Sequence, residues 1–423
     1  MKFLYRLTTL ILLGICSITT SMDAQNYERT AKNIKDNPTK KGPNLSVNLP
    51  FYTRNGNTTH FNLGLMSNIY RLEGCGLNLL SGTVRNDMNG LQISGLTNIT
   101  QNNAVGLQIS GISNIAGDNS YGCMLSGLMN ISNDMFSGVQ IAGISNITGD
   151  NTRGVNLAGI MNLTSGNVYG LQLAAVGNVG VRVKGLQLAG ISNNAIQNLT
   201  GMQLCGAANI AVKADKALQL SGITNICQGE FKGVQLAPGN YAGSVRGVQI
   251  GLLNLCTGKV EGVQIGVINH SKDSTAHKVG LVNITPSTRI QLLFYGGNMS
   301  KTNVAVRFKN RFTYTAMGFG THYLDLNDKF SGCLFYRAGF FHQLLPKLEL
   351  SGDFGYFHIE NFENEDATTP ERMYSLQGRV NIEYRLRKKL HLFASTGYSI
   401  TRYYNRNKVY EKKPIFEAGV ILF

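Results

Sequence analysis

Long apolar runs are what this sequence of 423 residues lacks. Beyond the N-terminal residues, no stretch reaches the roughly 18 consecutive apolar residues that a membrane-spanning helix requires. This absence excludes a helical anchor, so the mature chain can cross a membrane only with strands. A short apolar run at residues 7–18 follows a basic start, which is typical of an export signal. We therefore predict a signal peptide over residues 1–24.

The sequence also lacks the short motifs that mark metal, nucleotide or disulfide chemistry. Six cysteines follow the signal and form no CxxC pair, so we expect them to pack as small apolar residues. The glycines form no phosphate loop, and the GDN triplets at 117–119 and 149–151 lack the β-roll calcium motif. His391 has no evident acidic partner. We expect no metal, no cofactor and no enzymatic activity.

Charged and aromatic residues are scarce in the first two thirds of the chain and abundant afterwards. Residues 90–200 contain six charged residues, and residues 90–285 contain five aromatic residues. Residues 286–423 contain 25 aromatic residues, 19 Lys or Arg and 12 Asp or Glu. Such a change in composition indicates two kinds of structure, and we place the boundary near residue 285.

A repeat fills the first of these two regions. The stretch GLQISGLTNI at 90–99 returns as GLQISGISNI at 106–115, and related units follow at steps of 14 to 16 residues. Each unit alternates apolar and polar residues, bends at a glycine, continues through a second short alternating stretch and ends in about six polar residues. This pattern predicts two short strands and a return in each unit.

Two architectures are compatible with this unit. In a parallel β-solenoid of ~16-residue coils over residues 60–285, equivalent residues stack at about 4.8 Å and can share amide hydrogen bonds. In a large antiparallel barrel, loop lengths would alternate and aromatic residues would mark the membrane edges. The uniform spacing and the few aromatics favour the solenoid. Its predicted ladders consist of Gln92, Gln108, Gln140, Asn98, Asn114, Asn130, Asn146 and Asn162.

Stacking also predicts where the core and the ligand contacts of the solenoid lie. One unit cannot bury its own apolar face, so we expect stacked units to form a continuous apolar core. About thirteen coils would give a rod of roughly 60 Å. The Gln and Asn rows are expected to be stacking ladders, and the variable polar returns are the better candidates for contact with a carbohydrate or protein ligand.

Residues 286–423 alternate strictly over longer stretches, as the strands of a membrane barrel do. In residues 373–386, Arg379, Glu383 and Arg385 lie on one face, and aliphatic and aromatic residues lie on the other. Short turns alternate with longer polar loops, and the last strand ends on an aromatic residue. We predict a small antiparallel outer-membrane β-barrel of about eight strands, with the charged face inside. An interior filled by ion pairs argues against conductance.

The segment over residues 25–59 leaves the position of the solenoid open. Residues 44–51 alternate and are a possible first barrel strand, which would make the solenoid an external insertion between strands one and two. Alternatively, residues 289–297 begin eight contiguous strands and the solenoid lies in the periplasm. We expect the external arrangement, because residues 44–51 otherwise lack a role.

The signal, the Gly-Leu-Gln-Ile-Ser-Gly-Leu-x-Asn-Ile repeats and the closing barrel strands together resemble the surface repeat-containing outer-membrane proteins of Gram-negative bacteria. The repeat resemblance covers about residues 60–284 and is distinctive, whereas the barrel part is generic. It implies an all-β, surface-exposed protein in contact with outer-membrane lipid, and no catalytic residues carry over. Nucleic acid is not an expected partner, because the basic residues lie in the predicted barrel.

We therefore expect a non-enzymatic outer-membrane surface protein that displays the solenoid for binding, adhesion or scaffolding. One alternative is a large pore or transport barrel in which the repeats are membrane strands. Another is a periplasmic solenoid that anchors the envelope.

Overall fold

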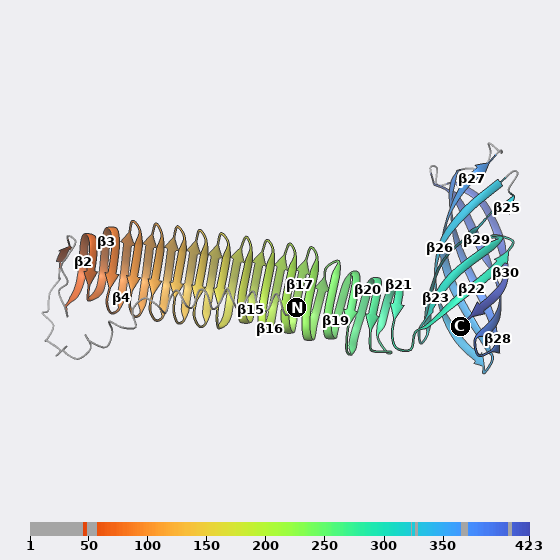
Figure 1. Ribbon diagram of the computed structural model, residues 1–423, viewed down its shortest axis with the longest axis horizontal. Coiled ribbons are helices and arrows are strands. Elements are labelled where there is room, and N and C mark those ends of the chain that lie inside the picture. Colours follow the sequence, from red (N-terminus) through yellow and green to blue (C-terminus); the bar gives the residue numbers. More distant parts are fainter. Residues whose placement is uncertain (1–44, 49–56, 323, 326–328, 365–370, 405–407) are drawn as a thin grey trace.

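The structure is a computed structural model that describes residues 45–48, 57–322, 324–325, 329–364, 371–404 and 408–423. The predicted signal peptide and most of the segment 25–59 lie outside the described residues. Within them no helix is long and apolar enough to span a membrane. Figure 1 shows a long rod of stacked strands that leads into a closed barrel at its C-terminal end. The predicted all-β fold, a parallel solenoid joined to an antiparallel barrel, is confirmed.

The rod is a parallel β-solenoid of about 14 coils. At about 4.8 Å per coil it is roughly 65 Å long. Its strands are β2 (Thr58–Ile69), β3 (Arg71–Val84), β4 (Met88–Ser94), β5 (Thr97–Thr100), β6 (Ala104–Ser110), β7 (Ser113–Ala116), β8 (Ser120–Ser126), β9 (Met129–Ser132), β10 (Phe136–Ala142), β11 (Ser145–Thr148), β12 (Thr152–Ala158), β13 (Met161–Thr164), β14 (Asn167–Ala174), β15 (Gly177–Ala189), β16 (Ser192–Cys205), β17 (Ala208–Ser221), β18 (Thr224–Leu236), β19 (Gly239–Cys256), β20 (Val260–Ser271) and β21 (His277–Ile284).

Each coil contains a longer strand, a first turn, a shorter strand and a second turn. In the coil that begins with β4, the first turn is at residues 95–96 and the second turn is at residues 101–103. The longer strand β4 pairs in parallel with β6, and the shorter strand β5 pairs in parallel with β7. Equivalent residues of successive units therefore lie directly beside each other.

The interior of the solenoid is polar, so the expectation of a continuous apolar core is wrong. Gln92 is 2% exposed and Asn98 is fully buried, whereas Leu96 at the first turn is 43% exposed. The neighbours Leu91 and Ile93 are only half-buried. Because side chains of a strand alternate between two faces, one choice of face places Gln and Asn inside and sends the aliphatic residues outside.

One apolar column does run inside the solenoid, next to the second turn. Its members lie two residues before the first residue of each repeat unit, and buried Ser120 and Thr152 interrupt the column. They include Met88, Ala104, Phe136, Val168, Val183, Leu199, Phe231, Val245 and Val260. The core thus combines this narrow column with the polar rows beside it.

Glycine at the third position of the longer strands permits the close approach of neighbouring coils. Gly106 has a φ of 120°, which an L-residue with a side chain rarely adopts. A Cβ on Gly106 would lie 2.0 Å from the carbonyl oxygen of Gly90 in the preceding coil. The close approach of the coils therefore favours glycine at the start of the repeats, where Ala217 is an exception.

The described part of this segment, residues 45–48, belongs to the solenoid and not to the barrel, so the prediction of a first barrel strand there is wrong. Strand β1 (Leu45–Asn48) pairs in parallel with β2, with Val47 opposite Leu63. The alternation of this segment suits a coil strand as well as a barrel strand, and the parallel edge of β2 is the partner that it meets. The barrel closes without it.

The C-terminal body is a closed, eight-stranded antiparallel barrel. Its strands are β22 (Arg289–Gly297), β23 (Thr302–Lys309), β24 (Thr313–Thr321), β26 (Lys329–Leu345), β27 (Leu348–Asn364), β28 (Arg372–Arg387), β29 (Leu390–Tyr403) and β30 (Val409–Leu422). The two-residue β25 (Leu324–Asp325) pairs antiparallel with the start of β26. Strand β30 pairs with β22 and closes the ring. The contiguous set of eight strands that begins at 289–297 is the arrangement observed.

Candidate functional site

The outer wall of the barrel is apolar. On β28, Leu376, Val380 and Ile382 point outward and are about half exposed, at 51%, 50% and 52%. Phe354 on β27 is 82% exposed. A closed barrel with large apolar side chains outside and charged side chains inside has the surface of a membrane-spanning barrel, whose outer wall contacts hydrocarbon.

The interior of the barrel holds buried ion pairs beside a cluster of buried apolar side chains that includes Phe335, Phe357 and Phe393. Arg307 Nη2 lies 2.9 Å from Glu383 Oε2, and Arg337 Nη2 lies 2.7 Å from Asp353 Oδ2. Arg379 Nε lies 3.1 Å from Glu417 Oε2. A cavity of only about 10 Å³ lies beside Arg307, Arg337 and Glu383 of this network. Such a volume holds about one water molecule, so the barrel interior is closely packed around this cavity.

The structure places the three predicted interior residues of β28 unequally. Arg379 and Glu383 are buried within the network. Arg385 is half-buried near the end of the strand, and His391 of β29 is opposite it in the register of the two strands. Arg379, Glu383 and Arg385 lie on the same face of β28, and Arg385 is the member nearest the end of the strand.

His391 has an acidic partner that sequence reasoning missed. Its Nδ1 contacts Glu383, which also accepts a hydrogen bond from Arg307. The short turn at 388–389 between β28 and β29 is the signal that could have found it, since such a turn sets the two residues on adjacent strands near the same level. Glu383 is held between two basic side chains, which is a structural ion network and not a nucleophile with its base.

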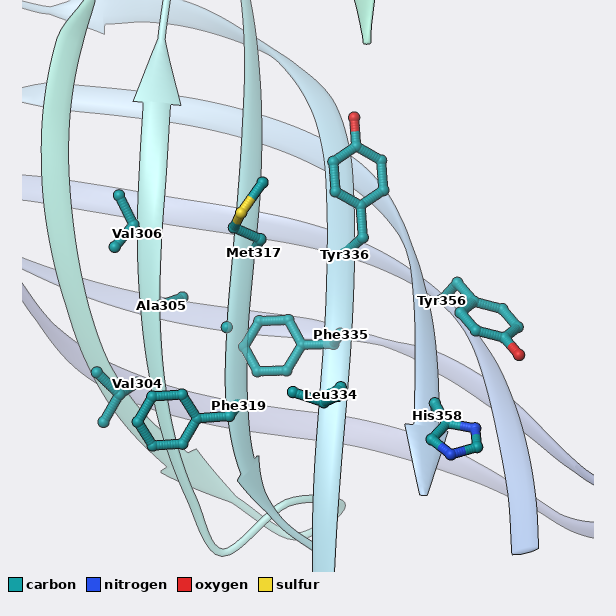
Figure 2. Close-up of a pocket in the computed structure, with 11 residues that line it drawn as sticks. Val304, Ala305, Val306, Met317, Phe319, Leu334, Phe335, Tyr336, Tyr356 and His358 are labelled. Atoms are coloured by element: carbon teal, nitrogen blue, oxygen red, sulfur yellow. The ribbon is translucent and has the colours of Figure 1, made fainter. Parts of the chain in front are cut away.

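A hollow on the outer wall lies across β23, β24, β26 and β27, with a volume of about 520 Å³. Figure 2 shows its lining, which is mainly aliphatic and aromatic, with Tyr356 and His358 at one side. Because the hollow opens on the apolar outer wall, its chemistry suits a hydrocarbon chain more than a polar ligand.

The predicted Asn ladder residues stack coil upon coil inside the solenoid. Asn98 Nδ2 donates to Asn114 Oδ1 at 2.8 Å, and the donation repeats from Asn114 to Asn130, from Asn130 to Asn146 and from Asn146 to Asn162 at 2.9 Å each. Each Asn also donates to carbonyl oxygens of the backbone. Because these side chains are buried, they stabilise the stack and do not face a ligand.

The Gln row is interrupted where the sequence departs from the repeat. Gln108 Nε2 donates to Gln92 Oε1 at 3.1 Å, but the next member of the row is Met124. Gln140 therefore has Met124 on one side and Asn156 on the other, and its Nε2 lies 3.7 Å from the sulfur of Met124. The row resumes further along, with Gln187, Gln203, Gln219, Gln235, Gln249 and Gln264 each donating to the preceding Gln.

The two edges of the solenoid differ in polarity. The first turns carry exposed aliphatic side chains, namely Leu96, Ile112, Leu128, Ile144, Ile160, Val176, Ile191, Ile223, Leu252 and Val267. Within residues 88–271, all of which are described, every Lys, Arg, Asp and Glu lies at a second turn or at the strand positions beside it. We call these the aliphatic edge and the charged edge of the solenoid.

The barrel wall caps the last coil of the solenoid. Tyr336 OH donates to the carbonyl oxygen of Gly280 at 2.9 Å, and Thr315 Oγ1 donates to that of Leu281 at 2.7 Å. Asn310 Nδ2 donates to the carbonyl oxygen of Asn283 at 3.2 Å. The open edge of β21 would otherwise present unpaired carbonyl groups, so the barrel completes the hydrogen bonding of the rod.

Among the described residues, no group of three or more His, Cys, Asp or Glu side chains lies close enough together to hold a metal ion. The solenoid cysteines are free thiols, and burial raises the pKa of Cys227 to about 11. A thiol with such a pKa is protonated at neutral pH, so Cys227 is a packing residue and not a reactive one.

No protein-family model and no curated protein matches this sequence. Solved structures that are similar to part of this chain include the following three. One comes from work on the de novo design of transmembrane β-barrels, with a TM-score of 0.22 and 15% identity over 32% of this chain and 95% of that one. Neisserial surface protein A has a TM-score of 0.22 and 11% identity over 31% and 92%. OmpT, an outer membrane protein of Vibrio cholerae, has a TM-score of 0.16 and 10% identity over 29% and 39%.

Proposed function

We propose that this chain is a non-enzymatic outer-membrane protein in which the barrel is the anchor and the solenoid is a scaffold on the periplasmic side. The ion-paired interior of the barrel supports an anchor over a pore, because its side chains fill the space that a conducting path would need. The commitment of His391 and Glu383 to that network supports a structural role for these titratable groups.

The end of the barrel at which the solenoid joins it supports the proposed side of the outer membrane. Arg289, the first residue of β22, pairs with Lys309 beside the short β23–β24 turn. Leu422, at the C-terminal end, pairs with both Leu292 and Leu390, which follows the short β28–β29 turn. The solenoid therefore enters at the end with the short turns. In bacterial outer-membrane barrels the short turns face the periplasm.

The external position of the solenoid depends on a barrel strand at residues 44–51. Residues 45–48 pair with β2 of the solenoid instead and do not support that position. On the periplasmic side, the charged edge is the surface available to a carbohydrate or protein ligand. The buried Gln and Asn rows are not available for binding.

An epitope-accessibility experiment tests the side. One tag is placed in the second turn at Asp118–Ser120, and a control tag is placed in the connection between β27 and β28. We expect antibody to label the control tag on intact cells and both tags after the outer membrane is permeabilised. Labelling of the Asp118–Ser120 tag on intact cells would reject the periplasmic scaffold and favour surface binding or adhesion.

A further inference from the structure

The aliphatic exterior of the solenoid is unusual for a body surrounded by water. Exposed aliphatic side chains repeat once per coil along the aliphatic edge, and half-buried ones such as Ile93 and Ile99 flank them on both sheets. Soluble proteins rarely expose contiguous apolar surface over more than a few hundred Å². Because the interior is polar, folding does not remove this surface from water.

The distribution of charge indicates what covers the aliphatic edge. Within residues 88–271, charged side chains are confined to the charged edge, and its strand positions expose Tyr121 and Tyr169 as well as the basic residues Lys184 and Arg246. Apolar residues on one side, charged residues on the other and tyrosine or basic residues between them are the order found at a membrane interface. The exposed aliphatic side chains of the first turns recur along the whole rod, which fits a continuous lipid surface better than a local protein contact.

The junction joins this surface to the lipid-facing wall of the barrel. Tyr336, which contacts Gly280 of the last coil, lies on β26 with exposed Leu334 and Phe340 on either side along the strand. Figure 2 shows Tyr336 beside the apolar hollow of the outer wall. The last coil therefore packs against the wall at the level of its apolar side chains, and the rod leaves the barrel sideways (Figure 1).

We propose that the solenoid is a monotopic membrane element, with its aliphatic edge inserted into the acyl chains of one leaflet and its charged edge in water. This inference rests on the proposed function, because the barrel supplies the anchor and the side. Backbone hydrogen bonds run from coil to coil, so insertion leaves the paired groups satisfied in lipid. A seven-residue longer strand spans about 23 Å, which exceeds a leaflet of roughly 15 Å and leaves the charged edge outside.

Tryptophan fluorescence of the full chain, reconstituted in phosphatidylcholine vesicles, tests this inference. The sequence contains no tryptophan, so each substitution gives a single reporter. Leu128→Trp reports on the aliphatic edge and Asp134→Trp reports on the charged edge of the same coil, and both positions are exposed. Leu376→Trp on the outer wall of the barrel is the positive control. Lipids brominated along the acyl chain serve as the quencher.

We expect Leu128→Trp to be quenched as strongly as Leu376→Trp and to emit at shorter wavelength than Asp134→Trp, which should stay unquenched. Ile160→Trp, on another coil, repeats the measurement in case Leu128→Trp does not fold. If both aliphatic-edge reporters match Asp134→Trp while Leu376→Trp is quenched, membrane insertion of the solenoid is rejected and the anchor stands. If Leu376→Trp is also unquenched, the barrel anchor itself is rejected.

Discussion

Asn130 shows how a buried amide holds neighbouring coils together. Its Nδ2 group donates to Asn146 Oδ1 at 2.9 Å and to the carbonyl oxygens of Ile141 and Met124, and its Oδ1 accepts from Asn114. One side chain thus contacts the coil before it, its own coil and the coil after it. The row satisfies buried polar groups that would otherwise destabilise the stack.

Replacement of Asn130 by leucine removes these bonds, so Asn114 loses the acceptor in the next coil and Asn146 Oδ1 loses its donor in the interior. We expect the free energy of unfolding to fall by about 1–3 kcal/mol, as for other buried polar groups left without a partner. Chemical denaturation followed by circular dichroism measures the change. Asn133→Leu, at an exposed second-turn position of the same coil, is the control and should change stability little. Equal losses of stability in the two variants would contradict a specific contribution of the Asn ladder to the free energy of unfolding.

Lys278 occupies the Gln position of the last coil, opposite Gln264. Among the described residues, Gln264 Oε1 has no hydrogen-bond partner, and the ammonium of Lys278 donates to the carbonyl oxygen of Ile284 instead. Burial lowers the pKa of Lys278 to about 8. Since the unfolded pKa is about 10.4, the unfolded chain binds more protons between these two values, and stability should rise with pH across that window.

Lys278→Gln should extend the ladder by donating to Gln264 and should remove this titration. We expect the free energy of unfolding at neutral pH to rise by about 0.5–1.5 kcal/mol, the net value of one hydrogen bond. Its increase between pH 8 and pH 10 should disappear. Denaturant unfolding at a series of pH values checks both, with exposed Lys272→Gln as the control. If the free energy of unfolding of the variant still rises between pH 8 and pH 10, a group other than Lys278 causes the increase.

At the scale of elements, alternation predicted the strands of both bodies but not which face lies inside. The pattern around Gln92 and Ile93 is the same whether the polar or the apolar set points inward, since the period of a strand is two in either case. We expected the apolar set of the repeats inside, as in a soluble solenoid, and it lies outside. For β28 the sequence predicted a membrane barrel, whose apolar face contacts lipid. The outward position of Val380 could therefore be predicted.

The outward face of β28 gives a test of the membrane barrel. Arginine in place of Val380 puts a charge on the outer wall near the middle of the strand, and we expect it to cost ~2–4 kcal/mol if that wall contacts hydrocarbon. Leu386→Arg, near the end of β28, should cost only about 0–1 kcal/mol, because charge is tolerated near the interface. Heat-modifiable mobility and urea unfolding in vesicles measure both. Normal assembly and equal stability of the Val380 variant would indicate a soluble sheet.

At the scale of the whole molecule, the rod and the barrel both bury polar side chains beside an apolar cluster and expose aliphatic side chains outside. The sequence predicted two bodies and a boundary near residue 285, because composition and period change there together. It did not predict how they meet, since Tyr336 and Gly280 are 56 positions apart and no repeat or turn links them. The contact depends on the closed shape of the barrel, which brings β24 and β26 to the open edge of β21.

The junction makes the stability of the last coil depend on the barrel wall. Thr315→Val and Tyr336→Phe together remove the two hydroxyl groups that donate to the carbonyl oxygens of β21 while they preserve side-chain volume. We expect amide hydrogen exchange in β21 to accelerate by about tenfold, since losing roughly 1.4 kcal/mol changes an opening equilibrium by that factor. Exchange in β4 and β5, far along the rod, should stay the same. Mass spectrometry of peptides from the full chain in vesicles gives these rates.

Tyr356→Phe is the matched control for the junction. Tyr356 lies on the neighbouring strand β27 and also faces the outer wall, but its hydroxyl contacts Tyr404 and not the solenoid. Its loss should therefore leave exchange in β21 unchanged. If the double variant also exchanges at the original rate, β21 is held by β20 alone, and the barrel does not cap the rod. If all three substitutions accelerate exchange alike, the effect arises from general loosening of the barrel wall, because only two of the three hydroxyl groups contact β21.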